Sequence, residues 1–317
     1  MLRMYLQLIN LNKSFGEKKV VKSLSLSIEK GEILCLLGPS GCGKTTTLKM
    51  IGGFLNADGG TINIDGKDIT KLPPESRPVT TVFQSYALFP HLTVLENVIY
   101  GLKFQGYSKN EAKKKGIEYL KIVGLEGYAN SKVHEISGGQ QQRVALVRSL
   151  IVNPKVLLLD EPLSNLDAKL RVKMREEIKL IQKKFNMTMV FVTHDQEEAL
   201  ALGDKIAIMN EGELVQIGSP EEVYNNPASI FSMNFLGNSN EFLDREGKSF
   251  YVRPENILIC ENGELYGEIL SRTFLGFYNQ YNILVEGKIL TVKSPYNEKV
   301  YNMGDIVRLT FTRRIYL

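Results

Sequence analysis

Cysteine is scarce in this 317-residue chain, which contains only Cys35, Cys42 and Cys260. None of them belongs to a C-x-x-C pair or stands at a metal-binding spacing from a histidine. The sequence therefore predicts neither a disulfide framework nor a zinc site, and it suits a reducing compartment. Long apolar runs are also missing, since no stretch approaches the roughly 18 apolar residues that a membrane-spanning helix needs. We therefore expect a cytosolic protein unless a partner holds it at a membrane.

An excess of charge of one sign is missing as well. The 39 Lys and Arg residues against 35 Asp and Glu residues leave a net charge of +4, too small to indicate nucleic-acid binding by itself. Lysine runs such as 113–115 are typical of solvated helix faces. The first eleven residues are apolar but are interrupted by Arg3, Gln7 and Asn10, which favours an edge strand over a secretion signal. The length predicts two domains.

One segment fits the phosphate-binding pattern G-x-x-x-x-G-K-[ST]. Its residues are Gly38, Pro39, Ser40, Gly41, Cys42, Gly43, Lys44 and Thr45, with Thr46 directly after them. A buried strand is expected before it at 32–37 and a helix after it at 46–51, so that backbone N–H groups and a positive helix end point at one place. Lys44 would reach the β- and γ-phosphates and Thr45 would ligate Mg²⁺. The alternative is a chance glycine-rich turn, which the strand–loop–helix context disfavours. The sequence therefore predicts a nucleoside-triphosphate site.

The rest of the chain separates into segments with different patterns of apolar and polar residues. Residues 93–152 read as helical, with a capping box at Ser108 and Glu111 and an apolar stripe of Ile117, Leu120 and Val123. Residues 170–185 predict a long amphipathic helix, and 206–217 a hairpin. Beyond residue 239, short strand-like runs alternate with glycine turns and predict a small antiparallel β unit, plausibly a barrel. The expected domains are 1–238 and 239–317.

Two carboxylates close an apolar strand at Val156–Leu159. Asp160 is placed to hold Mg²⁺ through water, and Glu161 to orient or deprotonate an attacking water. Acidic residues that merely end a strand would be the alternative, which a phosphate loop in the same chain disfavours. The chemistry expected here is hydrolysis of the terminal phosphate.

A second glycine motif, Ser137-Gly138-Gly139-Gln140, opens a helix. Such a helix start makes an anion-binding nest. One site needs only one phosphate loop, so a second nest suggests that two subunits face and complete each other's sites. A helix N-cap with glycines for tight packing is the alternative.

Gln84 and His194 each follow a predicted strand. The Gln84 amide can reach both metal and water, and the His194 ring can donate a hydrogen bond to the γ-phosphate. A lone histidine is more often structural. The end of a parallel strand, where ligands bind in open α/β sheets, favours a functional role here.

This combination resembles the nucleotide-binding subunit of an ATP-binding cassette (ABC) transporter. The matching segments are Gly38–Thr45, Gln84, Ser137–Gln140, Asp160-Glu161, Ser164–Asp167 and His194. The resemblance implies an α/β P-loop cassette with a RecA-like core, an antiparallel β subdomain and a helical subdomain at about 93–152. It further implies that Phe15 stacks on adenine, that Asp167 lies across a dimer interface and that Tyr86–Pro90 borders a groove for a permease helix. Ile136 replaces the usual leucine, which changes little.

The C-terminal β unit, with Arg253-Pro254-Glu255 near its start, resembles the OB-like (TOBE) domain of importer ATPases. That group serves maltose, polyamine, ferric-iron and 2-aminoethylphosphonate uptake, and residues 77–86 resemble the polyamine and aminoethylphosphonate branches most. The resemblance implies ATP and Mg²⁺ as ligands, a homodimer, integral-membrane permease partners and an external solute-binding protein. It places the subunit at the cytoplasmic face of a bacterial-type plasma membrane, with no nucleic-acid partner.

Rival interpretations come from other classes. Soluble ABC ATPases of DNA repair carry coiled-coil or zinc insertions between the two glycine motifs, and this interval is short. Translation factors carry two cassettes, and this chain has one. The β unit also resembles oligonucleotide-binding barrels, in which aromatic residues stack on bases. Its candidates are Phe274, Phe277, Tyr278 and Tyr281, which are as well explained by a barrel core or a dimer contact. An exporter is the nearest rival, and the β unit argues against it.

Overall fold

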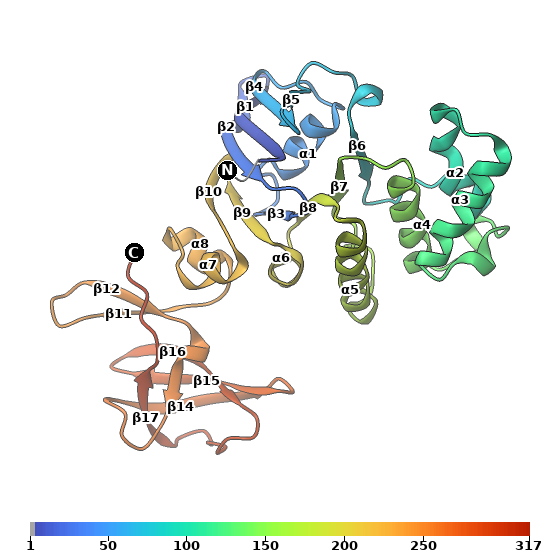
Figure 1. Ribbon diagram of the computed structural model, residues 1–317. Helices are drawn as coiled ribbons and strands as arrows, with labels where there is room; N and C mark the ends of the chain where they lie inside the picture. Colours follow the sequence, from blue (N-terminus) through green and yellow to red (C-terminus); the bar gives the residue numbers. More distant parts are fainter. Residues whose placement is uncertain (1–3) are drawn as a thin grey trace. The chain divides into compact units, whose positions relative to one another are not determined.

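The computed structural model describes residues 4–317, which form two compact units, 4–220 and 221–317 (Figure 1). This division lies earlier in the chain than residue 239, near which the sequence changes from helical to strand-like patterns. Helices α7 (Pro220–Asn225) and α8 (Ile230–Phe235) stand at the beginning of the second unit. The domain boundary at 238/239 stays a prediction. No helix among residues 4–317 is long and apolar enough to cross a membrane.

The first unit is built on a six-stranded sheet with the order β10-β9-β3-β8-β7-β6. Its strands are β3 (Ile33–Leu37), β6 (Val79–Val82), β7 (Val156–Asp160), β8 (Thr188–Thr193), β9 (Lys205–Asn210) and β10 (Glu213–Gly218). All pairings are parallel except that of β10 with β9, the predicted hairpin. Every residue of β3 and β8 is buried, as expected of parallel strands covered on both faces.

Helices connect these parallel strands. Helix α1 (Lys44–Gly52) follows β3, α5 (Ala168–Phe185) joins β7 to β8, and α6 (Gln196–Leu202) joins β8 to β9. Helix α5 buries Met174, Ile178 and Ile181, which share one helical face as the sequence predicts. A strand–helix–strand path of this kind returns every parallel strand in the same direction, so the carboxyl ends of the strands lie along one edge of the sheet.

A second, antiparallel sheet has the order β2-β1-β4-β5. Its strands are β1 (Leu6–Phe15), β2 (Lys18–Ile28), β4 (Gly59–Ile64) and β5 (Lys67–Asp68). The prediction of an edge strand at the N-terminus is wrong, because β1 pairs with β2 on one side and with β4 on the other. Leu6 and Leu8 are buried on either side of Gln7, as in an alternating inner strand, whereas Asn10 has a φ of 48° and lies where the register shifts before buried Leu11. Residues 1–3 of the predicted strand lie outside the described part.

The region 93–152 is helical as predicted and forms a separate group of helices (Figure 1). It contains α2 (Val94–Ile99), α3 (Lys109–Ile122), α4 (Gly138–Leu150) and the short 3₁₀ segments Tyr100–Gln105, Glu126–Tyr128 and Val133–Glu135. The capping box of Ser108 and Glu111 is confirmed. The stripe prediction is wrong at Ile117, which is 37% exposed. The buried face instead follows the i, i+4, i+8 spacing of Ala112, Gly116 and Leu120.

The second unit is all-β after its two short helices. Strands β11 (Asn240–Leu243) and β12 (Ser249–Val252) form a hairpin. The others form an antiparallel sheet with the order β13-β17-β14-β15-β16, an OB-like, nearly closed barrel. Its strands are β13 (Ile257–Ile259), β14 (Leu265–Phe274), β15 (Tyr278–Val285), β16 (Lys288–Pro295) and β17 (Ile306–Phe311). Tyr281 is fully buried in the barrel core, while Phe274 and Phe277 are exposed at the β14–β15 turn.

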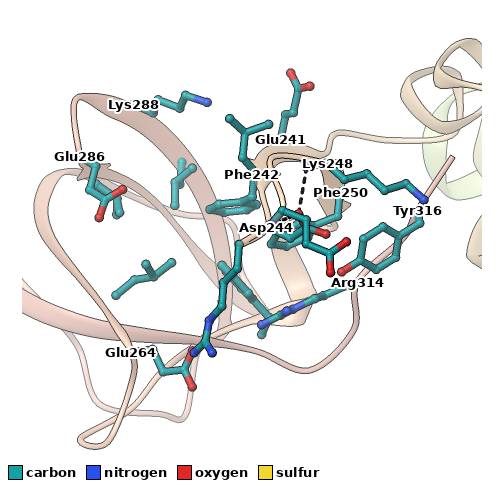
Figure 2. Close-up of a pocket in the computed structure, with 17 residues that line it drawn as sticks. Glu241, Phe242, Asp244, Lys248, Phe250, Glu264, Glu286, Lys288, Arg314 and Tyr316 are labelled. Carbon is teal, nitrogen blue, oxygen red and sulfur yellow. Dashed lines mark hydrogen bonds between the residues drawn. The ribbon is translucent and has the colours of Figure 1, made fainter.

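A cavity of about 930 Å³ opens between the β11–β12 hairpin and the barrel strands (Figure 2). Its walls combine the aromatic residues Phe242, Phe250 and Phe311 with side chains of both charge signs. The Arg314 guanidinium lies over the Phe250 ring at 5.0 Å and Lys248 over the Tyr316 ring at 5.3 Å. Because acidic and basic groups both line the cavity, its charge favours no single class of ligand.

Candidate active site

Four strand ends meet at the carboxyl edge of the six-stranded sheet (Figure 1). Strand β3 leads into the loop Gly38–Thr45, β7 ends at Asp160 and continues into Glu161, and β8 leads to His194. Gln84 follows β6, on the other side of β7. The parallel pairings therefore bring together residues that are far apart in the sequence, at the position where open α/β sheets bind ligands.

Two glycines of the loop stand where a side chain does not fit. A Cβ on Gly38 would lie 2.2 Å from the Met209 carbonyl oxygen, and a Cβ on Gly43 would lie 2.7 Å from that of Val20. Gly43 also has a φ of 104°, a left-handed conformation that glycine adopts without a steric penalty. The backbone can thus curl directly into helix α1, whose first N–H groups face the loop.

The Lys44 side chain lies beneath this loop and is only 5% exposed. Its ammonium donates hydrogen bonds to the carbonyl oxygens of Gly38 at 2.7 Å and Pro39 at 3.0 Å. The Cys42 thiol is also buried, 3.8 Å from the same nitrogen. Ser40 and Gly41 are exposed at the crest of the loop. The arrangement fixes a positive charge at the centre of a ring of backbone groups.

Thr45 and Asp160 form a pair of oxygen donors beside the loop. Oγ1 of Thr45 lies 3.2 Å from Oδ1 of Asp160. Burial raises the pKa of the Asp160 carboxyl, and the neighbouring Glu161 raises it further, whereas the Thr45 hydrogen bond lowers it. A hydroxyl and a partly buried carboxylate are oxygen ligands of the kind that Mg²⁺ takes, and a cation there would offset the cost of keeping this carboxylate charged. The residues present therefore fit a magnesium ion.

Glu161 and His194 face each other across the ends of β7 and β8. Oε2 of Glu161 lies 3.3 Å from Nδ1 of His194. Glu161 has a φ of 44°, which is unusual for a residue with a side chain and often marks a functional site. Its backbone N–H donates to the Val192 carbonyl at 3.1 Å, which holds this turn against β8. The His194 side chain is 59% exposed and can meet a ligand.

Gln84 is tied to the Glu161 segment through Ser164 and Asn165. Its Nε2 donates to the Ser164 hydroxyl at 3.1 Å, and that hydroxyl donates to the Glu161 carbonyl at 2.9 Å. Asn165 Nδ2 donates to the Gln84 carbonyl at 3.1 Å. Sequence reasoning named Ser164 and Asn165 only as part of a family pattern. Their bridging role shows only in three dimensions, because about 80 residues separate them from Gln84.

The second glycine motif lies elsewhere on the first unit. Ser137 caps α4, and its partner in a full capping box is Gln140. Ser137 and Gly138 are exposed, while a Cβ on Gly139 would lie 2.8 Å from the Leu170 side chain of α5. Within residues 4–317, no hydrogen bond or ion pair joins Ser137–Gln140 to the phosphate loop. The motif instead neighbours the start of α5, where exposed Asp167 is the N-cap.

Phe15, the residue predicted to stack on adenine, lies at the end of a strand of the antiparallel sheet. It ends β1, its side chain is exposed, and the Lys13 ammonium lies 5.6 Å from the centre of its ring. An exposed ring of this kind offers a free face for stacking.

Comparisons with known protein families agree with this architecture. The model of the family described as ABC transporter matches residues 21–164, and the model of the TOBE domain matches residues 250–315. A solved structure, the dimeric post-hydrolysis state of the ATP-binding cassette MJ0796 bound to ADP and Pi, is similar with a TM-score of 0.61 and 35% sequence identity. The similarity covers 68% of this chain and 98% of that one. The fold is that of an ABC-type ATPase.

Relatives that match most of the chain identify the group within the ABC family. The Fe(3+) ions import ATP-binding protein FbpC of Rhizobium etli is 46% identical over 303 residues, which cover 86% of each protein. The spermidine/putrescine import ATP-binding protein PotA of Acetivibrio thermocellus is 42% identical over 330 residues, covering 96% of this chain and 93% of that protein. PotA of Clostridioides difficile is 44% identical over 321 residues and covers 93% of this chain and 92% of that protein. The chain belongs to the family of ABC importer ATP-binding subunits.

Proposed function

We propose that two copies of this chain enclose two ATP molecules, each bound between the phosphate loop of one copy and the Ser137–Gly139 segment of the other. The supporting observation is the separation of the two glycine motifs within one subunit. Lys44 and the strand-end residues gather at one edge of the sheet, whereas Ser137 and Gly138 are exposed and the adjoining Gly139 packs against Leu170 in the first turn of α5. A subunit built in this way presents half of two sites, and Asp167 lies on the surface that meets the partner.

Within each site the strand-end residues divide the chemistry. The loop N–H groups and Lys44 bind the β- and γ-phosphates, and Phe15 stacks on adenine. Thr45, Asp160 and Gln84 would hold Mg²⁺, which neutralises phosphate charge. Glu161 orients and deprotonates the attacking water, and His194 donates a hydrogen bond to the γ-phosphate. Gln84 is well placed to link metal and water because Ser164 already ties it to the Glu161 turn.

Hydrolysis then controls the dimer. The γ-phosphate is the anion that bridges the two copies, so its loss removes the contact that holds the dimer closed. Opening and closing of the dimer moves the helical region 93–152 and Tyr86–Pro90. These segments contact integral-membrane permease subunits at the cytoplasmic face of the membrane and transmit the change to them. An external solute-binding protein delivers the solute to that permease. The named import ATP-binding proteins among the relatives support this role.

The identity of the transported solute is the most specific part of the proposal. Relatives named for spermidine/putrescine import and for Fe(3+) import match this chain about equally well, at 42–46% identity. We favour a polyamine or 2-aminoethylphosphonate because of the resemblance of residues 77–86. The relatives support ferric iron as well as they support a polyamine, and a sugar is a further alternative. All are small polar or charged solutes, and the permease and the solute-binding protein select among them.

The test measures ATP hydrolysis as a function of protein concentration. Specific activity is expected to rise with concentration as the dimer forms, and Glu161→Gln is expected to abolish turnover but retain binding of a labelled ATP analogue. A label is needed because the chain has no tryptophan. Specific activity that is independent of concentration, with no dimer in light scattering, would contradict the two-copy site. Stimulation by spermidine, aminoethylphosphonate, ferric iron or maltose, with the permease and binding protein in vesicles, identifies the solute.

A further inference from the structure

Arg171 makes contacts with three different partners around the candidate site. It lies at the end of the first turn of α5, four residues after the N-cap Asp167. Its Nη2 donates to the Leu166 carbonyl at 3.3 Å, and its Nη1 donates to Oδ2 of Asp195 at 3.1 Å. Its Nε lies 3.7 Å from Oε1 of Glu198. One guanidinium therefore joins the turn before α5 to the N-terminal turn of α6.

The same two carboxylates hold the backbone around His194. Oδ1 of Asp195 accepts a hydrogen bond from the Glu198 N–H at 3.1 Å. Oε2 of Glu198 accepts from the Thr193 hydroxyl at 2.6 Å, and that hydroxyl accepts from the Asp195 N–H at 3.0 Å. The residues on both sides of His194 are thus fixed without using its ring, which remains directed at Glu161.

Glu198 makes this network costly to disturb. Its side chain is only 4% exposed, whereas the Arg171 side chain is 31% exposed. Burial raises the pKa of the Glu198 carboxyl, and the Thr193 hydrogen bond and the Arg171 charge lower it. Removing Arg171 leaves a buried carboxylate without its nearest cation, and the α6 turn is then free to shift.

We propose that Arg171 is a positioning residue that couples the Asp167 turn to the His194 turn, so that docking of Asp167 against the partner copy sets the position of His194. This inference rests on the proposed function of Asp167 and His194. Arg171 itself touches neither His194 nor the phosphate loop. It acts through the planar fork of its guanidinium, which contacts Leu166, Asp195 and Glu198 at once.

The neighbouring arginine supplies a matched control. Arg175 lies one turn further along α5, and its ion-pair partner is Glu197 at 3.7 Å. The Arg175 side chain is 14% exposed, and its charge, like that of Arg171, lowers the pKa of the Glu198 carboxyl. Arg175→Met therefore removes a cation near Glu198 from the same helix while leaving the hydrogen bonds of Arg171 to Leu166 and Asp195 in place.

The test compares Arg171→Met, Arg171→Lys and Arg175→Met in the full chain. For Arg171→Met, kcat for ATP hydrolysis is expected to fall by about tenfold to a hundredfold, since misplacement of a catalytic group by about 1 Å has effects of this size. The Kd for a labelled ATP analogue is expected to stay unchanged. Arg171→Lys is expected to recover only part of kcat, because an ammonium cannot reach all three partners, and Arg175→Met is expected to match the wild type.

A second variant separates positioning from folding. Asp195→Asn keeps an N-cap oxygen for α6 but replaces the carboxylate that pairs with Arg171. It is expected to lower kcat without changing the Kd for the analogue or the urea midpoint. Wild-type kcat in Arg171→Met would overturn the inference, and so would parallel losses of kcat, nucleotide binding and stability in both variants. Failure of the proposed function is distinguishable from failure of this inference, because the wild type itself would then not hydrolyse ATP. Glu161→Gln is assayed beside the other variants to give the rate expected without turnover.

Discussion

The hydroxyl of Thr45 and the carboxylate of Asp160 come within 3.2 Å of each other although they stand on different strand–helix connections. Thr45 opens the helix after β3, and Asp160 ends β7. Strand β8 lies between them in the sheet, paired with both. The pair therefore depends on the order of the strands, and it defines where a magnesium ion fits beside the phosphate loop.

Replacing Asp160 by asparagine tests this ion site. The amide keeps the shape of the side chain but removes the charge, so the magnesium-dependent part of ATP hydrolysis is expected to fall by about a hundredfold or more. The measurement is a Mg²⁺ titration of the ATPase rate, with Glu118→Gln on the exposed face of α3 as the control. An unchanged Mg²⁺ dependence in Asp160→Asn would place the ion elsewhere.

Gly138 offers a test in which stability and activity move in opposite directions. A Cβ at this position meets nothing within 4 Å inside the subunit, so Gly138→Ala is expected to raise the free energy of unfolding slightly, by about 0.5–1 kcal/mol. In the proposed closed dimer the same methyl group would stand where the partner's ATP binds. Hydrolysis is therefore expected to fall by at least about tenfold, equivalent to about 1.4 kcal/mol.

The control for that prediction is Gly127→Ala. A Cβ there also meets nothing within 4 Å, and the residue lies in the 3₁₀ segment Glu126–Tyr128, away from the Ser137 motif in sequence. It is expected to leave the ATPase rate unchanged. If Gly138→Ala and Gly127→Ala have the same rate as the wild type, the surface around Ser137 does not take part in the site.

Arg253 is expected to carry much of the stability of the second unit. Its side chain is fully buried and donates to the carbonyl oxygens of Met233, Gly237 and Tyr224. Arg253→Met leaves these acceptors unsatisfied and should lower the free energy of unfolding of this unit by about 3 kcal/mol. Urea unfolding of the full chain, compared with the exposed Arg245→Met, measures the difference. Equal midpoints for the two variants would contradict this role.

Tyr224 predicts a dependence of stability on pH. Burial, together with the hydrogen bond to Glu255, raises the pKa of the Tyr224 phenol to about 12. A pKa raised on folding contributes stability that is present below the unfolded value of about 10 and is lost as pH rises through the folded value. The unfolding midpoint of the wild type should therefore fall more steeply between these two pH values than that of Tyr224→Phe. Parallel curves would show that Tyr224 titrates normally.

Much of the architecture follows from local sequence patterns. The apolar runs at 33–37, 156–159 and 189–193 predict buried parallel strands because such strands are covered on both faces, and the glycines of 38–43 predict the loop between strand and helix. Capping residues such as Ser108 predict helix starts, because their hydrogen bonds are local. These features need no knowledge of the rest of the molecule.

The parts that sequence did not predict depend on contacts between distant segments. The inner position of β1 depends on pairing with β4, which lies about 50 residues further along the chain. The hairpin strand β11 is short and half exposed, so its pattern does not stand out. Arg77 is the clearest case, since arginine is mostly exposed in proteins but this one is buried, donating to the carbonyls of Met50 and Ile51 at the end of α1. A buried arginine becomes recognisable only when its acceptors are assembled around it.

The most direct measurement is light scattering of the Glu161→Gln variant with and without Mg-ATP. This variant should bind ATP and fail to hydrolyse it, so the account predicts a dimer that forms only with nucleotide. Adding Lys44→Ala to the same variant removes the buried ammonium of the phosphate loop and should abolish the dimer. A Glu161→Gln protein that binds the labelled nucleotide but remains a monomer at every concentration would contradict the paired arrangement of the phosphate loop and Ser137.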